Sequence, residues 1–276
     1  FGMAIAPTLL GEAERFAHAT TPLALLIAPT RELALQVQRE LQWLYAETGA
    51  QIAAGVGGMD IRTERRALER GAHIVVGTPG RLRDHISKGA LDLSQVRAVV
   101  LDEADEMLDL GFREDLEFIL EAAPESRRTL LFSATVPRAI ADLAKTFQRD
   151  ALRLVATSAG EQHADIEYQQ IVVRNDEREH AVINMLLLHD SSNTIVFCHT
   201  LANRGFPVVA LSGELTQAER SNALQAMRDG RARVCVATDV AARGIDLPNL
   251  DLVIHADVPS NPETLLHRSG RTGRAG

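Results

Sequence analysis

The sequence predicts an α/β protein of two domains, each built on a mostly parallel sheet with helices on both faces. Short apolar runs alternate with amphipathic, capped segments along nearly all of the 276 residues, as in parallel strands joined by crossover helices. Most of these runs are apolar at every position, which is expected of strands buried on both faces. A polar stretch at residues 157–165 separates two such series. We interpret it as a linker between a first domain at 1–156 and a second at 166–276.

The first series predicts five strands and a further candidate strand, each followed by polar or helical sequence. Thr30 is the expected N-cap of a helix running from Arg31 to about Thr48, and Thr78-Pro79 combines a cap with proline at the first helical position. Further helices are expected at 61–70 and from Pro137. The expected strands are 23–30, 51–58, 73–78, the run beginning at Ala98, 129–135 and the further candidate, 152–156.

The second series repeats the pattern, with helices expected at 177–189, at 216–228 and from Asn261-Pro262. Thr216 and Glu219 have the spacing of a capping box. The expected strands are 168–174, 194–200, 207–213, 234–239 and 250–257. Only about six residues separate the strands that end at Thr200 and begin at Pro207, whereas neighbouring parallel strands need roughly a dozen. Either these two strands pair antiparallel, or a crossover helix is missing from the sequence.

Composition narrows the class of protein. With 46% hydrophobic residues the chain can bury a core, and no apolar run approaches the roughly 18 residues of a membrane span. Cys198 and Cys235 lie in apolar strand-like runs without metal-ligand spacing, so we expect free core thiols in a reducing compartment, the cytoplasm. The net charge of −8 argues against a polybasic nucleic-acid binder but leaves room for a local basic groove. All but two of the 29 basic residues are arginines, which suit forked phosphate contacts.

The strand beginning at Ala98 ends abruptly in three carboxylates, Asp102, Glu103 and Asp105. Ligands of open α/β sheets sit beyond the carboxyl ends of the strands. Carboxylates there suit a hydrated Mg²⁺ that also touches phosphates, and a second carboxylate could orient or deprotonate a water. The structural alternative is a turn followed by acidic residues that favour the first helical turn.

Other polar strings also follow predicted strands. Thr30 and Thr78 offer helix-start N–H groups to an anion, a glycine pair lets a backbone approach a ligand, and Arg271 and Arg274 are spaced to point one way from a helix. Each string alone has a structural explanation, such as a capped helix or a solvated helix face. Seven such strings in order, each at the end of a predicted strand, favour a functional explanation over a structural one. The seven strings are 28–34 (APTRELA), Gly57-Gly58, 78–81 (TPGR), 102–105 (DEAD), 133–135 (SAT), 237–246 (ATDVAARGID) and 267–274 (HRSGRTGR).

On these motifs the chain, from Leu23 to Gly276, resembles the DEAD-box family of RNA helicases in helicase superfamily two, with a bacterial character. The resemblance implies two RecA-like domains that close over ATP on one side and RNA on the other. It implies ATP-dependent unwinding of short duplexes or remodelling of RNA–protein complexes, with ATP and Mg²⁺ as cofactors.

On the nucleotide side, the resemblance implies that Asp102 holds Mg²⁺ through water and that Glu103 positions or activates the attacking water. Asp105 and His267 would couple the domains. Ser133 and Thr135 would link hydrolysis to RNA release. Arg271 and Arg274 would be the arginine fingers, and Asp246 would lie near the nucleotide ribose.

On the RNA side, the resemblance implies contacts with the sugar–phosphate backbone, which make recognition largely sequence-independent, and 2′-hydroxyl contacts would favour RNA over DNA. The first-domain contacts would be Pro29, Thr30, Arg31, Gly57, Gly58, Thr78, Gly80 and Arg81. The second-domain contacts would be Gly213, Thr238 and Arg243. The sequence identifies no protein partner and no membrane partner.

Some features depart from the family pattern. No GxxxxGK[ST] phosphate loop occurs in the 276 residues; because Phe1-Gly2-Met3-Ala4 resembles the helix after that loop, we expect the loop before Phe1. Ser212-Gly213-Glu214 stands where many members have His-Gly-Asp, and we expect the end of the second domain after Gly276. Because the phosphate loop does not occur in these residues, the alternative function is a catalytically inactive RNA-binding remnant. A dinucleotide-binding oxidoreductase is disfavoured because no GxGxxG opens a βαβ unit.

Overall fold

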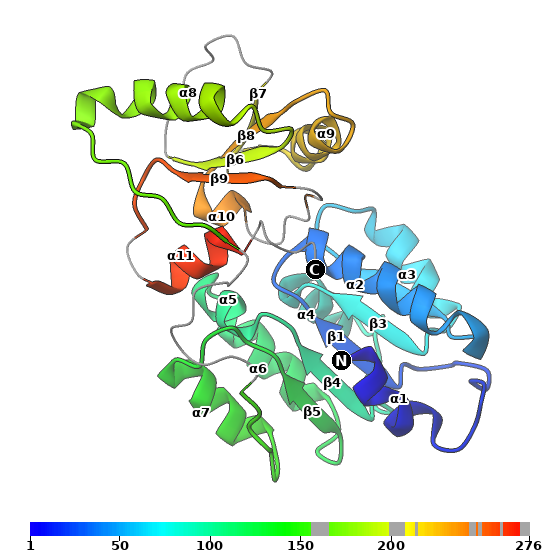
Figure 1. Cartoon of the computed structure of the whole chain (residues 1–276). Coiled ribbons are helices and arrows are strands. Elements are labelled where there is room, and N and C mark those ends of the chain that lie inside the picture. Colours follow the sequence, from blue (N-terminus) through cyan, green and yellow to red (C-terminus); the bar gives the residue numbers. More distant parts are fainter. Residues whose placement is uncertain are drawn as a thin grey trace. The chain divides into compact units, whose positions relative to one another are not determined.

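A computed structural model of the chain describes residues 1–155, 166–198, 208–212, 215–242, 247, 250–259 and 262–270. The chain divides into two compact units, Phe1–Arg153 and Leu154–Gly276, and each contains its own sheet (Figure 1). The predicted linker at 157–165 lies outside the described residues.

The first unit is built on a five-stranded sheet in the order β2-β3-β1-β4-β5, and every neighbouring pair is parallel. Ile27, the last residue of β1, pairs with Gly77 of β3 and Leu101 of β4. The carboxyl ends of these three strands therefore lie side by side, and we call this end of the sheet its carboxyl edge. Each of the five predicted strands is present in shorter form. Their bounds are Ala24–Ile27 (β1), Ile52–Gly55 (β2), Ile74–Gly77 (β3), Ala98–Leu101 (β4) and Arg128–Leu131 (β5).

Helices cover both faces of this sheet because successive strand residues point to opposite sides. Leu25 and Ile27 of β1 pack with α3 to α7, whereas Ala24 and Leu26 pack with α1 and α2. The central strands are buried at every position, as their uninterrupted apolar runs predicted. The helices are Gly2–Leu10 (α1), Arg31–Leu44 (α2), Ile61–Glu69 (α3), Pro79–Ser87 (α4), Ala104–Asp109 (α5), Arg113–Ala122 (α6) and Arg138–Phe147 (α7).

The predicted helix starts are confirmed in position. The Thr30 hydroxyl accepts a hydrogen bond from the Leu33 amide at 3.3 Å and caps α2. Thr78 occupies the N-cap of α4 with Pro79 at the first helical position, but the Thr78 side chain makes no capping hydrogen bond. The helix predicted to reach Thr48 ends at Leu44 and gives way to a 3₁₀ turn, η1 (Ala46–Thr48).

The second unit has a four-stranded sheet in the order β7-β8-β6-β9, again with all pairs parallel. Helices α9 and α10 pack on one face, and Val182 of α8 packs on the other. The predicted capping box is present, since the Thr216 and Glu219 side chains each accept a hydrogen bond from the other's backbone amide. The strands are Thr194–Phe197 (β6), Val208–Leu211 (β7), Val234–Ala237 (β8) and Leu252–His255 (β9). The helices are Asn175–Glu177 (η2), Arg178–His189 (α8), Gln217–Arg228 (α9), Asp239–Ala242 (α10) and Pro262–Ser269 (α11).

Three expectations are wrong. Residues 152–155 and 168–174 form no strand, and Leu154 and Val172 are 82% and 87% exposed. Both segments have strand-like composition, but strand formation depends on a partner that buries the side chains. The short β6–β7 connection does not reflect antiparallel pairing, because each of these strands pairs in parallel with β8, which lies between them. The missing-helix alternative remains a prediction, since residues 199–207 lie outside the described part.

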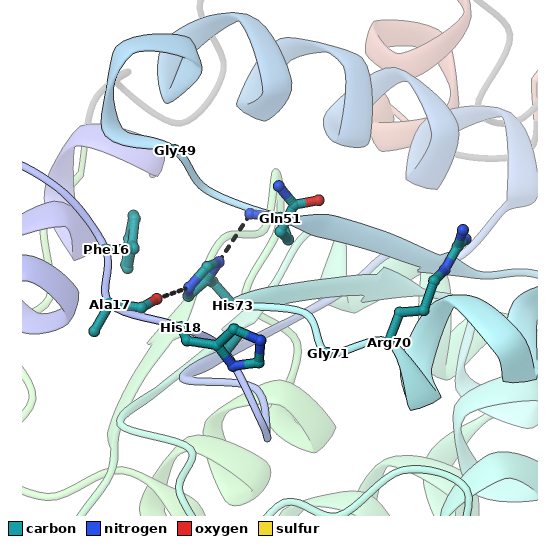
Figure 2. A pocket seen from close by; sticks show the side chains of 9 residues that line it. Phe16, Ala17, His18, Gly49, Gln51, Arg70, Gly71 and His73 are labelled. Atoms are coloured by element: carbon teal, nitrogen blue, oxygen red, sulfur yellow. Dashed lines mark hydrogen bonds between the residues drawn. The ribbon is translucent and has the colours of Figure 1, made fainter.

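A polar pocket of about 250 Å³ lies at the amino ends of the strands of the first sheet, opposite to their carboxyl ends (Figure 2). Gln51 and His73, which directly precede β2 and β3, line it together with the 16–19 segment. The Gln51 amide donates to Nδ1 of His73 at 2.8 Å, and Nε2 lies 2.6 Å from the Ala17 carbonyl oxygen, so Nδ1 is the acceptor and Nε2 the donor in this bridge. The pocket is thus separate from the edge where the strands end.

Neither cysteine is bonded to another residue as a disulfide. Cys198 and Cys235 are buried free thiols, as predicted, and burial raises the pKa of Cys235 to about 12. No helix within the described ranges is both long enough and apolar enough to cross a membrane.

Candidate functional site

The carboxyl edge of the first sheet places Asp102 and Glu103 where β4 ends. The Asp102 amide donates to the Ile27 carbonyl at 2.9 Å, so the sheet ladder continues to this residue. Glu103 follows in a left-handed conformation with φ of 48° and is the N-cap of α5. A non-glycine residue in this region is strained, and such strain is common at functional sites.

Asp102 is partly buried. Burial raises the pKa of its carboxyl, and the one hydrogen bond that opposes this shift comes from the Glu103 amide to Oδ1 at 3.1 Å. A cation beside this carboxylate would reverse the shift, so the site favours positive charge. Within the described part of the chain, no group of three or more His, Cys, Asp or Glu side chains could hold a metal. A Mg²⁺ here would therefore take most of its ligands from water and phosphate, as Mg²⁺ commonly does.

Asp105 links the acidic segment to the 133–135 string. It is only 5% exposed, and its Oδ2 accepts from the Thr135 amide at 2.8 Å and from the Thr135 hydroxyl at 2.7 Å. The Ser133 hydroxyl accepts from the Asp105 amide at 3.2 Å and donates to the Thr135 carbonyl at 2.6 Å. The two motifs are thus joined in one hydrogen-bonded assembly.

The predicted RNA-binding residues of the first unit also gather at this edge. They follow the ends of three adjacent strands, β1, β3 and β2. Gly58 has φ of +77°, which suits glycine, and among the described residues no hydrogen bond is donated by the amide of Gly57 or Gly58. The residues placed here are Pro29, Thr30, Arg31, Gly57, Gly58, Thr78, Gly80 and Arg81.

Glu64 and His85 are buried polar residues that the sequence interpretation did not single out. Glu64 is 4% exposed, and its Oε2 lies 2.8 Å from both Nη1 of Arg81 and Nε2 of His85. Its Oε1 accepts from the Val56 amide at 2.9 Å. Burial alone would raise the pKa of Glu64, but hydrogen bonds from His85, Val56 and Arg81 outweigh it and lower the pKa. The spacing of Glu64 in a charged helix gave no signal of this role.

In the second unit, the described site residues centre on Arg268, which belongs to the 267–274 string. Its guanidinium forks onto the Asp239 carboxylate, with Nε–Oδ1 at 2.5 Å and Nη2–Oδ2 at 2.7 Å, and Nη1 donates to the Asp257 carbonyl at 2.6 Å. Thr238, a predicted RNA contact, precedes α10, and its hydroxyl accepts from the Ala241 amide at 3.4 Å. The 237–246 and 267–274 strings are therefore joined within this unit, although neither Asp239 nor Arg268 was assigned a role from sequence.

Arg268 also lies over an aromatic pair. Its guanidinium carbon is 4.9 Å from the Phe197 ring centroid, and that ring stacks on His255 at 5.9 Å. Burial first, and then the charge of Arg268, lowers the pKa of His255 to about 4. His255 is thus held neutral at physiological pH.

The remaining predicted site residues cannot be placed. Helix α11 contains His267, but the structure describes nothing of its side chain. The others lie outside the described residues, and they are Gly213, Arg243, Asp246, Arg271 and Arg274.

Two parallel sheets flanked by helices, with functional motifs after the strands, define a protein with two RecA-like α/β domains. The DEAD/DEAH box helicase family model matches residues 3–143, and the helicase conserved C-terminal domain model matches residues 168–276. The chain belongs to the DEAD/DEAH box helicase family.

Relatives with assigned names agree with this membership. DEAD-box ATP-dependent RNA helicase 9 of Oryza sativa subsp. japonica is 40% identical over 288 residues, covering 100% of this chain and 45% of the relative. DEAD-box ATP-dependent RNA helicase CshA of Geobacillus kaustophilus is 42% identical over 264 residues, covering 92% of this chain and 56% of the relative. The chain therefore spans about half the length of these curated relatives.

Solved structures show the same fold. S. cerevisiae Dbp5 bound to RNA and ADP BeF3 matches with a TM-score of 0.83 at 28% identity, covering 100% of this chain and 73% of that one. Mss116p bound to ssRNA and AMP-PNP matches with a TM-score of 0.79 at 30% identity, covering 93% and 58%.

Proposed function

We propose that this chain acts in an ATP-dependent RNA helicase, in which RNA-stimulated ATP hydrolysis is coupled to local duplex unwinding or to remodelling of RNA–protein complexes. The carrying observation is the Asp105–Thr135 linkage, which ties the acidic segment to the 133–135 string at the carboxyl edge of a parallel sheet. Family membership and the names of the relatives support the same activity.

On the nucleotide side, Asp102 is the proposed Mg²⁺ residue, acting through water, because it is partly buried at the strand end. When bound, the ion would neutralise charge on the ATP phosphates. Glu103 is the proposed residue that orients the attacking water, since its left-handed backbone sets it directly beside Asp102. Arg271 and Arg274 are the proposed arginine fingers, and Asp246 is the proposed ribose neighbour.

Coupling of hydrolysis to RNA release is assigned to Ser133 and Thr135, which share hydrogen bonds with Asp105. Communication between the two units is assigned to Asp105 and His267. Because Asp105 already bonds to the 133–135 string, any movement of this string on hydrolysis would be transmitted through its carboxylate.

RNA is the proposed polymeric ligand of the first unit's carboxyl edge. The proposal is supported by the amides of Gly57 and Gly58, which donate no hydrogen bond to any described residue, and by the start of α4 at Pro79. Such groups recognise phosphate and not base identity. Gly213, Thr238 and Arg243 are the proposed contacts of the second unit. Two free buried thiols suit a reducing compartment, and we propose the cytoplasm.

The test is Glu103→Gln in the full-length natural protein, with Glu117→Gln on α6, whose side chain is 38% exposed, as a matched control. We expect Glu103→Gln to retain RNA affinity and to lose ATP turnover by about two orders of magnitude or more, while the control behaves as wild type. Normal turnover in Glu103→Gln refutes the role of Glu103. Absence of turnover in the wild-type protein, with RNA binding intact, favours the alternative, RNA binding without hydrolysis.

A further inference from the structure

Glu64 joins three elements of the first unit through one buried carboxylate. Its Oε1 accepts from the amide of Val56, just beyond β2, and its Oε2 contacts Arg81 and His85 of α4. Glu64 itself belongs to α3. A buried carboxylate with this many donors is costly to disturb, because loss of the charge or of its shape leaves donors without acceptors.

The contacts of Glu64 bracket one loop. Residues 56–60, named here the diglycine loop, connect β2 to α3 and contain Gly57 and Gly58. Glu64 holds the loop at its start through the Val56 amide. Arg81, which is itself held by Glu64, donates weakly to the Met59 carbonyl at 3.4 Å near the end of the loop.

We propose that Glu64 is a positioning residue for RNA binding, which fixes the diglycine loop and the Arg81 side chain in the arrangement that receives an RNA phosphate. The inference rests on the proposed function. The amides of Gly57 and Gly58 make no hydrogen bonds among the described residues, so their direction is set by the anchors on either side. Preorganised donors bind an anion more tightly than mobile ones because less ordering is required on binding.

Glu64 also determines how Arg81 meets its ligand. The Arg81 side chain is only 16% exposed, and its Nη1 is committed to Glu64. Arg81 therefore acts in part as a brace for the loop, in contrast to a freely exposed phosphate-binding arginine.

Glu64→Gln separates these roles with almost no change of volume. A glutamine amide has one acceptor oxygen and one donor nitrogen. If the amide oxygen of the glutamine accepts from the Val56 amide, its NH₂ group faces Arg81, which is also a donor, and that hydrogen bond is lost. If the amide is flipped, the NH₂ group faces the Val56 amide, and the hydrogen bond to Val56 is lost. Either orientation releases one anchor.

The experiment measures the affinity of the full-length protein for a labelled single-stranded oligouridylate in the presence of a non-hydrolysable ATP analogue. We expect Glu64→Gln and Glu64→Ala to weaken RNA binding about tenfold, with affinity for the nucleotide alone unchanged. Glu69→Gln is the matched control, because Glu69 lies on the same helix in an exposed pair with Arg65, and it should bind RNA as wild type does.

Two further readouts separate positioning from general stability. Hydrogen exchange at the Val56 amide should accelerate in Glu64→Ala while the β1 and β4 amides stay protected. In a double-mutant cycle, Glu64→Gln combined with Arg81→Met should bind RNA no more weakly than Arg81→Met alone.

Wild-type RNA affinity in a folded Glu64→Gln protein would overturn the inference while leaving the proposed function intact. Equal losses of RNA and nucleotide affinity would also overturn it, since they indicate a general structural role. If the wild-type protein binds no RNA, the proposed function fails and this inference fails with it.

Discussion

Oδ2 of Asp105 accepts two hydrogen bonds from Thr135, one from its backbone amide at 2.8 Å and one from its hydroxyl at 2.7 Å. Thirty positions of sequence separate the partners, and the contact is part-buried, with Asp105 itself buried. It joins the acidic segment after β4 directly to the segment after β5. This is the mechanical connection that the proposed coupling of hydrolysis to RNA release requires.

Thr135→Val tests that connection by removing the hydroxyl while keeping the shape and the backbone amide. We expect the free energy of unfolding to fall by about 2 kcal/mol, because a hydrogen bond to a charged acceptor is lost. ATP turnover should persist while duplex unwinding falls. Thr146→Val is the control, since its exposed hydroxyl donates to the Asp142 carbonyl one helical turn away. Parallel loss of turnover and unwinding would contradict a coupling role.

Gly71→Ala should destabilise the first unit. Gly71 has φ of +91°, and an added Cβ would lie 2.1 Å from the Ala19 carbonyl oxygen. We expect a loss of roughly 3 kcal/mol or more in urea unfolding, from backbone strain together with a clash that moves the 16–19 segment. Gly89→Ala is the comparison, because Gly89 also has positive φ but open space around it; about 1 kcal/mol is expected there. Equal effects at the two positions would show that the clash is relieved at no cost.

Arg268→Lys should destabilise the second unit. The Arg268 side chain is 8% exposed and forks onto Asp239, a geometry that a lysine ammonium cannot reproduce. Because Asp239 is partly exposed, we expect a loss of about 1–3 kcal/mol. Arg231→Lys, in a pair with Asp229 where the arginine is 63% exposed, should change stability by less than about 0.5 kcal/mol. Similar changes for both variants would remove the argument for a structural fork.

His255 should make the second unit less stable in mild acid. Its pKa is lowered from 6.5 to about 4 in the folded state, by burial first and by Arg268 second. Below pH 6.5 the unfolded chain takes up a proton that the folded chain does not, so stability is full above 6.5, falls as the pH drops towards 4, and then levels off.

The contribution of His255 at about pH 5 should be on the order of 2 kcal/mol. Urea unfolding at about pH 7.5 and about pH 5 should therefore show a smaller acid loss in His255→Phe than in wild type. The exposed His189→Asn should keep the wild-type dependence. An unchanged acid loss in His255→Phe would contradict the shifted pKa.

The strands of both sheets were predictable because each lies in an apolar run that is visible in the local sequence. The run from Leu23 is apolar without interruption, and β1 is buried at each of its four positions. Alternation with capped helices then predicts parallel pairing. The strand predicted at 168–174 is absent because β-branched composition expresses only a propensity. Among the described residues no element covers Val172, which is 87% exposed.

The location of the candidate site residues that follow strands was also predictable, since parallel strands end at a common edge. Asp102, Gly57 and Thr78 arrive there for that reason alone. The contacts of Glu64 and Arg268 were not predictable, because their partners lie on elements that are distant in the sequence and come together only in the fold. Arg268 pairs with an aspartate 29 positions away, and Glu64 looks like a solvent-facing residue in its charged helix until α4 packs over it.

The most direct test of the central claim is the rate of ATP hydrolysis by the full-length wild-type protein as single-stranded RNA is added. We predict a low rate without RNA and a saturable increase of about tenfold or more with it, with single-stranded DNA much less effective because it lacks the 2′-hydroxyl. A hydrolysis rate that does not respond to RNA, or that responds equally to DNA, would contradict the proposed function.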